Sequence, residues 1–160
     1  MALNHYTQIT EFIKQLAESD PLVNKITQGF ADEIAFDKMV LFPLVHLFVG
    51  NFTLAENGST VLWDVQIGAM QRRDTNKTVN TDTYYKNNNE VDNFNETSAI
   101  LIRLVSRLIS EFESKKITVS AVSSAEKLAM EYGKDLDGYI MGLTLEIPNT
   151  DISLCQYTLP

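Results

Sequence analysis

The chain has 160 residues, 44% of them hydrophobic and 21% charged, and its net charge is -8 with an isoelectric point near 4.7. This is the composition of an ordinary globular protein, and the acidic balance argues against a protein that grips phosphate backbones through a basic face. No apolar run approaches the roughly 18 residues that span a membrane, no signal peptide is visible, and one cysteine excludes an internal disulfide framework. We therefore expect one cytosolic, soluble domain over residues 1–160, without a metal or other cofactor.

An amphipathic helix is predicted near the N-terminus, because apolar side chains recur at helical spacing over residues 7–19. Asp20-Pro21 ends it, since proline disfavours the helical conformation of the residue before it. Residues 23–30 then predict a short edge strand. Residues 31–40 are acidic and ambiguous, and one helical turn is an option there.

A β-hairpin is predicted next. Residues 44–54 are nearly all apolar, as in a strand that is covered on both faces. Asn57-Gly58 readily adopts the positive φ angles of a tight turn. Apolar and polar residues alternate over 61–69, which predicts a second strand with one drier face.

A long polar segment follows at residues 71–89, with almost no aliphatic side chains. Such a stretch inside a compact domain is normally disordered or functional. Tyrosine and arginine are favoured at the centres of protein interfaces, and they also suit phosphate binding and base stacking. A flexible, solvated loop is the remaining interpretation. The candidate partner-binding residues of this arm are Arg72, Arg73, Lys77, Tyr84, Tyr85 and Lys86.

The clearest pattern in the chain is the amphipathic helix predicted over residues 90–116. Large apolar residues recur along one face, and serine, arginine and glutamate mark the other. Asn93 or Asn95 is expected to cap its start, because an asparagine side chain accepts from unpaired helix N–H groups. Lys115 and Lys116 complement the negative end of the helix dipole.

Two further strands are predicted from alternation over residues 117–121 and 139–147, with a short helix or loop at 123–132 between them. Pro148 ends the last strand, and the tail at residues 149–160 is irregular. This order of elements predicts an α+β fold, a mostly antiparallel sheet with two main helices packed on one face.

Few residues point to catalysis. The lone Cys155 has no basic neighbours to favour a thiolate, and His46 lies inside a predicted strand, where it is packed or faces a pore. Asp135 and Asp137 flank a turn and are expected to be solvated or capping. A small enzyme or ligand-binding domain that uses Asp135, Asp137 or His46 stays as the competing class.

Several segments together resemble a family of phage proteins. They include the extended Phe42-Pro43-Leu44 strand, the hairpin that ends in a polar segment, and the helix preceded by Asn89-Glu90-Val91-Asp92. The most specific piece is the ending, with Asp135-Leu136-Asp137-Gly138-Tyr139, alternating Met141–Leu145 and Ile147-Pro148-Asn149. Cys155 before Pro160 is a further feature of the resemblance. In this layout the chain resembles the tail-terminator or tail-completion proteins of tailed phages that infect Bacteroidetes, crAss-like phages among them. Segment 71–89 is longer than that layout predicts.

The resemblance implies a tail-terminator-like fold and a virion structural protein with no enzymatic activity. Copies would form a homo-oligomeric ring, a hexamer or dodecamer, in the phage neck or tail, after synthesis in the bacterial cytoplasm. The ring would contact neck, portal and tail proteins, and DNA would pass through it without specific binding. A head–tail adaptor or a tail-hub or baseplate ring is the alternative within this class. The arm at 71–89 would order on assembly, and Cys155 and Tyr157 would form a second contact.

Overall fold

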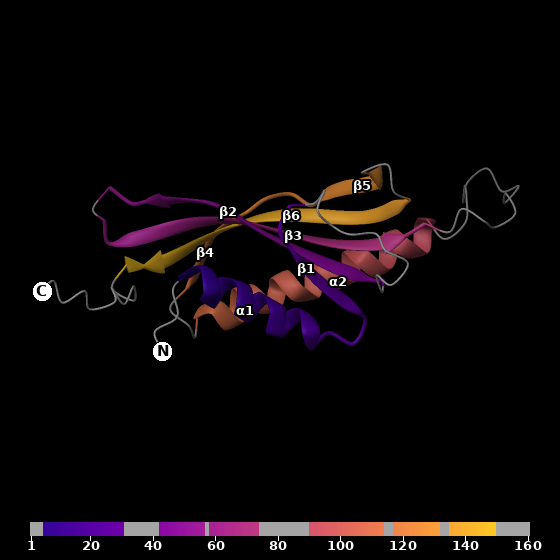
Figure 1. Cartoon of the computed structure of the whole chain (residues 1–160), viewed down its shortest axis with the longest axis horizontal. Coiled ribbons are helices and arrows are strands. Elements are labelled where there is room, and N and C mark those ends of the chain that lie inside the picture. The colour runs from indigo at the N-terminus through magenta and orange to yellow at the C-terminus, as the bar shows by residue number, and fades with distance from the viewer. Residues whose placement is uncertain are drawn as a thin grey trace, which may run out of the picture.

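The computed structural model describes residues 5–30, 42–56, 58–73, 90–113, 117–131 and 135–149, with the side chains of residues 129–131 left out. In this part of the chain, two helices lie on one face of a six-stranded, mostly antiparallel sheet (Figure 1), which confirms the predicted α+β architecture. The elements in chain order are α1 (His5–Glu18), β1 (Lys25–Gln28), β2 (Leu44–Leu54), β3 (Thr60–Arg72), α2 (Glu90–Phe112), β4 (Thr118–Val122), β5 (Glu126–Glu131) and β6 (Leu136–Pro148).

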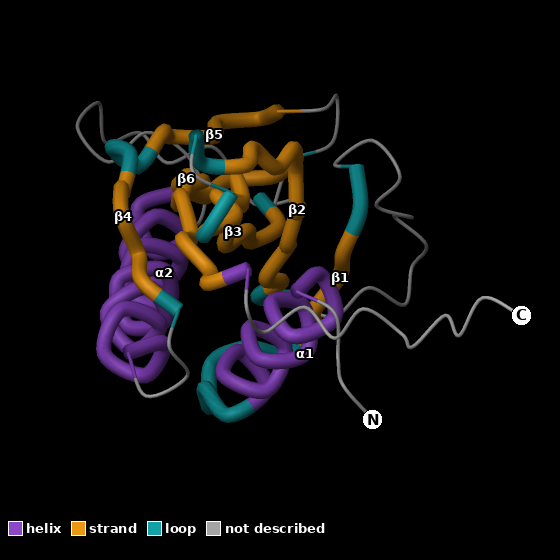
Figure 2. The backbone as a smooth tube through the Cα atoms, turned by 90° about the vertical axis from the view of Figure 1, so that its left-hand side faces the viewer, coloured by secondary structure: helices purple, strands orange, loops and turns teal. Residues whose placement is uncertain are grey.

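The sheet has the order β1-β2-β3-β6-β4, and β5 pairs with β6 as well. β1 lies parallel to β2, whereas all other pairs are antiparallel. β4 lies beside residues 143–146 of β6, and β5 lies beside residues 136–140, so these two strands share the outer edge of β6. Figure 2 shows β1 and β4 on opposite sides of the sheet. The long β3–β6 pair forms its centre.

Both helices pack their apolar stripes against the same face of the sheet (Figure 2). The inward side chains come from alternate positions of the strands, as a period of two requires. Phe12 of α1 and Phe112 of α2 contact each other with ring centroids 4.8 Å apart. Burial of each large apolar side chain contributes about 1.5–3 kcal/mol. The core members with no exposed surface are Ile9, Ile13, Ala17, Val45, Ile67, Ala69, Ile100, Leu108, Phe112 and Leu145.

The predicted hairpin is confirmed, but β2 is covered on both faces only in its first part. Gly58 has a φ of 65°, and its N–H donates to the carbonyl of Ala55 at 2.8 Å, as a tight turn requires. Residues 44–47 are buried, whereas residues 51–54 are exposed. The reason is visible in Figure 1, where the β2–β3 hairpin extends beyond the helix layer.

Two local predictions are wrong. Residues 126–131 form β5 instead of a helix or loop, because the outer edge of β6 offers backbone groups for pairing, and pairing overrides local helix propensity. Helix α2 begins at Glu90, before the expected asparagine caps. Asn93 is buried and donates to the carbonyl of Arg72 at 3.2 Å, so its side chain serves tertiary structure instead of a cap.

None of the helices within the described ranges has the length and apolar character needed to cross a membrane. Residues 31–41, 74–89, 114–116 and 150–160 lie outside the described residues, and so do the predictions made for them.

Candidate functional site

A buried ion pair joins the ends of β3 and β6 beneath the start of α2. The guanidinium of Arg73 donates to both carboxylate oxygens of Asp137, with Nε–Oδ2 at 2.9 Å and Nη2–Oδ1 at 2.6 Å. Asp137 has no exposed surface, and Arg73 is 8% exposed. Nδ2 of Asn93 donates to Asp137 Oδ2 at 3.2 Å. The hydrogen bonds to Asp137 raise the pKa of Arg73 above its ordinary value, so Arg73 remains charged.

The same cluster joins the two ends of segment 74–89. Arg73 precedes that segment and Glu90 follows it, and Arg73 Nη2 lies 3.3 Å from Glu90 Oε1. Asn93 bridges the two sides as well, because its amide also donates to the carbonyl of Arg72. Residues 72–73, which precede segment 74–89, and residues 90–93, which follow it, are therefore in direct contact.

This geometry changes the expectations for the residues around the arm. Arg72 belongs to β3, where it pairs with Leu136, and its side chain is exposed. Arg73 anchors the base of the arm and lies inside, not on a contact surface. The expectation that Asp137 is solvated is wrong, because its position on the inner face of β6 demands a buried cation. The remaining arm and tail candidates lie outside the described residues: Lys77, Tyr84, Tyr85, Lys86, Cys155 and Tyr157.

His46 is packed inside β2, one of the two placements expected for it, and both ring nitrogens have partners. Nδ1 lies 2.8 Å from Thr27 Oγ1, and Nε2 lies 2.9 Å from the carbonyl of Gly29. A carbonyl only accepts, so Nε2 carries the proton and Nδ1 accepts from the threonine hydroxyl. Burial lowers the pKa of His46, and the Gly29 contact opposes this in part. The histidine thus fastens β1 to β2.

Two residues of the enzyme alternative, His46 and Asp137, lie on opposite faces of the sheet. His46 pairs with Gly68, which pairs with Ile140, so these positions lie on one face of the sheet. Asp137 is three positions from Ile140 in the same strand and so lies on the other face. Within the described ranges, no three His, Cys, Asp or Glu side chains gather where they could hold a metal ion. His46 and Asp137 therefore cannot act on one substrate together.

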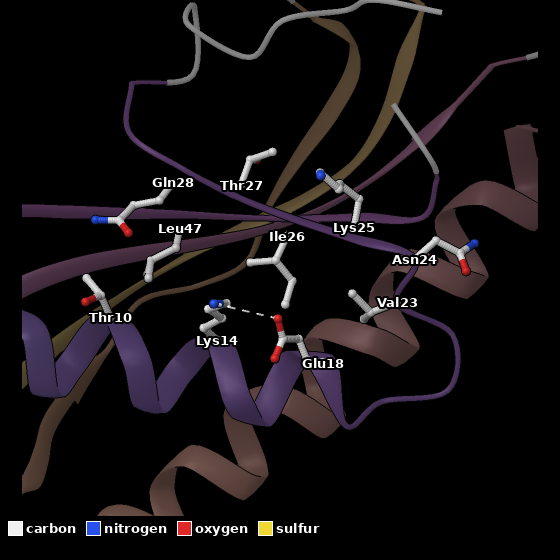
Figure 3. A pocket seen from close by; sticks show the side chains of 10 residues that line it. All are labelled: Thr10, Lys14, Glu18, Val23, Asn24, Lys25, Ile26, Thr27, Gln28 and Leu47. Atoms are coloured by element: carbon white, nitrogen blue, oxygen red, sulfur yellow. Dashed lines mark ion pairs between the residues drawn. The ribbon is translucent and has the colours of Figure 1, made fainter. Parts of the chain in front are cut away.

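A cleft of about 560 Å³ opens between α1 and β1 (Figure 3). Lys14 and Glu18 lie on its α1 wall and form an ion pair, with Nζ–Oε1 at 4.0 Å. Residues 24–28 form the other wall, and Leu47 of β2 also lines it. The volume suits a small molecule. Its charged side chains, Lys14, Glu18 and Lys25, are all exposed, so the cleft lacks the desolvated charge that is typical of a catalytic centre.

Each side of the sheet ends in a strand edge that no described strand covers. On one side, β1 pairs only with Leu44–Leu47, so the rest of the β2 edge is left open. On the other side, β4 and β5 pair with β6, and their outer edges have no strand partner in the described part of the chain.

Only some of these edges carry charge, which normally discourages pairing with another chain. β1 contains Lys25, and β5 begins with Glu126-Lys127. By contrast, residues 48–54 (FVGNFTL) and 117–122 (ITVSAV) contain no charged residue. The sheet therefore has one uncharged open edge on each of its two sides. We call these the hairpin edge (residues 48–54) and the β4 edge (residues 117–122).

The hairpin edge is accompanied by exposed apolar side chains on the helix side of the sheet. Phe52 is 58% exposed and Leu54 is 56% exposed. Phe52 pairs with Trp63, whose ring it contacts at a centroid distance of 4.9 Å. Trp63 packs against the helix-side core, so Phe52 lies on that face too. Apolar groups gathered like this often mark an interaction site.

The β4 edge adjoins a second exposed apolar surface. Ile102 and Ile109 are seven positions apart and so share one stripe of α2, and they are 62% and 42% exposed. The neighbouring Arg103 pairs with Asp20 at the end of α1, with Nε–Oδ2 at 2.9 Å. The isoleucine stripe therefore lies on the flank of α2 away from α1, which is the β4 side (Figure 2). Val122 of β4 is also 45% exposed.

Comparison with known proteins adds no assignment to this geometry. Neither a scan against protein-family models nor a search of curated proteins finds a match to this chain. Inference about function therefore rests on the residues and on their arrangement.

Proposed function

We propose that this protein is a virion structural protein that assembles into a homo-oligomeric ring in the neck or tail of a tailed phage. The observation that carries the proposal is the pair of uncharged open edges on opposite sides of one sheet (Figure 2). Two different patches on opposite sides favour a heterologous contact, in which each copy offers one patch to the other patch of its neighbour. Such contacts close into a ring when the rotation between neighbours completes a circle.

The resemblance to tail-terminator and tail-completion proteins supports the placement in a phage neck or tail. Its most specific segment forms β6 and ends at Asn149, which secures the turn of the hairpin. The N–H of Asn149 donates to the carbonyl of Ser59 at 2.8 Å, and its Nδ2 donates to the carbonyl of Gly58 at 2.8 Å. The residues that carry the resemblance thus hold the hairpin edge in place.

The net charge of -8 also suits a ring through which DNA passes without being held, because nonspecific DNA affinity comes from neutralising phosphates with cations. Partners would be further copies of this chain and the neighbouring neck, portal or tail proteins. A head–tail adaptor, a tail hub and a baseplate ring share this assembly geometry and differ in those neighbours.

Native mass across a concentration series tests the proposal. We expect a discrete species at about six or twelve times the subunit mass of 18.0 kDa, because closed symmetry favours fixed multiples. Variants His46→Gln and Asp135→Asn should assemble as the wild type does, whereas the competing enzyme class predicts that they lose an activity while they stay folded. A strict monomer at every concentration contradicts the ring.

A further inference from the structure

We infer that neighbouring copies join through the hairpin edge of one and the β4 edge of the next, with the two strands antiparallel. The inference rests on the proposed ring and names its subunit interface. The partner is a second copy of this chain, because each copy carries both halves of the contact.

Strand direction supports the antiparallel arrangement. β2 and β6 are both antiparallel to β3, so they run the same way, and β4 runs the opposite way. A copy rotated about an axis roughly along the strands keeps its strand direction. Its β2 therefore meets the β4 of its neighbour antiparallel, which is how the β4–β6 pair already continues the sheet.

The register follows from rows of paired residues across the sheet. Phe52 pairs with Trp63, Trp63 with Leu145, and Leu145 with Val119, so the two edges lie at the same level along the strands. A closed ring has no net rise from one subunit to the next. Phe52 of one copy is then beside Val119 of its neighbour, and by the same count Thr53 is beside Thr118.

The side chains at this contact match. Phe52 and Leu54 belong to the β2–β3 hairpin, which extends beyond the helix layer (Figure 1), and both are exposed. The neighbour offers exposed Ile102 and Ile109 on the helix side, next to its β4 edge. Docking would bury these apolar groups against one another, as at the core of a stable interface.

The other end of the sheet explains why the contact stays local. β1 lies at the level of β5, because Thr27 pairs with His46, His46 with Gly68, Gly68 with Ile140, and Ile140 with Glu126. In a flat continuation, β1 of one copy and β5 of the next would occupy the same place. The two subunits must therefore separate at that end, and the contact is confined to the hairpin edge and the β4 edge. Both strands carry charges suited to water.

Cysteine cross-linking tests the register directly. In a Cys155→Ser background, Thr53→Cys and Thr118→Cys place thiols at two exposed positions predicted to face each other across the interface. Oxidation of the double variant should give a ladder of covalent multimers. Each single variant should stay mainly monomeric on a denaturing gel, and an equal mixture of the two singles should give a covalent dimer. Gln15→Cys paired with Thr118→Cys is the matched control, since Gln15 is exposed on α1 away from the contact.

Point substitutions test the same contact by affinity. Phe52→Asp and Ile102→Asp should each weaken assembly at least tenfold, measured by mass photometry, and leave the monomer folded because both side chains are exposed. Val91→Asp changes a residue that is 45% exposed in the first turn of α2, outside the contact, and should assemble normally. The proposed interface is wrong if the wild type, Phe52→Asp and Ile102→Asp form rings equally well and the double-cysteine variant gives no ladder of covalent multimers. That result would leave the proposal of a ring intact. A wild type that never assembles overturns both.

Discussion

Removal of the Asp137 carboxylate should destabilise the fold severely. In Asp137→Ala, the charged guanidinium of Arg73 would stay 8% exposed and lose both of its hydrogen bonds, at 2.9 Å and 2.6 Å, to the carboxylate. Removal of one partner of a buried pair costs about 3–5 kcal/mol, because the remaining charge loses its main partner. Glu90 Oε1 stays 3.3 Å from Arg73 Nη2 but is partly exposed, so it compensates that charge only in part. For a domain of this size that corresponds to a fall of about 6–20 °C in melting temperature.

The assay is urea unfolding followed by the fluorescence of Trp63, at a protein concentration where the wild type is monomeric, so that assembly does not add to stability. Glu18→Gln is the matched control, because Glu18 forms an exposed pair with Lys14 and should change stability by no more than about 0.5 kcal/mol. The double variant Arg73→Met/Asp137→Leu should be more stable than Asp137→Ala, since no lone charge remains buried. A loss below about 1 kcal/mol in Asp137→Ala would refute the reasoning, because so small a cost belongs to a solvated carboxylate.

Three further outcomes are expected. Gly138→Ala should cost at least about 1–3 kcal/mol of unfolding free energy, because its Cβ would overlap the carbonyl oxygen of Ala69 in the paired β3. Gly142→Ala should cost less, because its Cβ would lie 3.3 Å from the hydroxyl oxygen of Ser123. Equal losses of unfolding free energy in the two variants would contradict this prediction. Burial lowers the pKa of His46, so the unfolded chain takes up a proton first as the pH drops, and the free energy of unfolding should fall below about pH 6.5. His46→Gln should flatten that slope below about pH 6.5, and an unchanged slope would assign it to other groups. The emission of Trp63, which contacts Phe52 at the hairpin edge, should move to shorter wavelength as assembly excludes water, and a concentration-independent spectrum would argue against burial there.

Local patterns predicted most of the fold. The strand bounds of β2 were correct because an apolar run meets an Asn-Gly turn. The strong apolar period of α2 identified its core face, except that Ile109 was counted in that face and is 42% exposed. Strand β5 was missed because its sequence, EKLAME, is rich in helix formers, and only the open edge of β6 makes it a strand.

The buried ion pair could have been found in part. Alternation along β6 extends from Tyr139 back to Asp137, which places a carboxylate on the core face and demands a cation. Nothing local identifies that cation as Arg73, which is 64 positions away in the chain. Arg73 instead looked like part of the polar arm, because a charged residue after a strand is usually solvated.

The open edges also depend on tertiary structure. Phe52 and Leu54 read as core residues in an apolar run, and their exposure follows from where the helix layer ends. The absence of charge in residues 48–54 and 117–122 is visible in the sequence. Whether these uncharged segments form open edges depends on the order of strands in the sheet, which is set by long-range strand pairing.

Electron microscopy of the purified oligomer tests the ring most directly. We predict closed particles with a fixed number of subunits around an axial opening, because a heterologous contact with no rise closes on itself. Monomers at every concentration, or open filaments that grow without limit, would contradict the account.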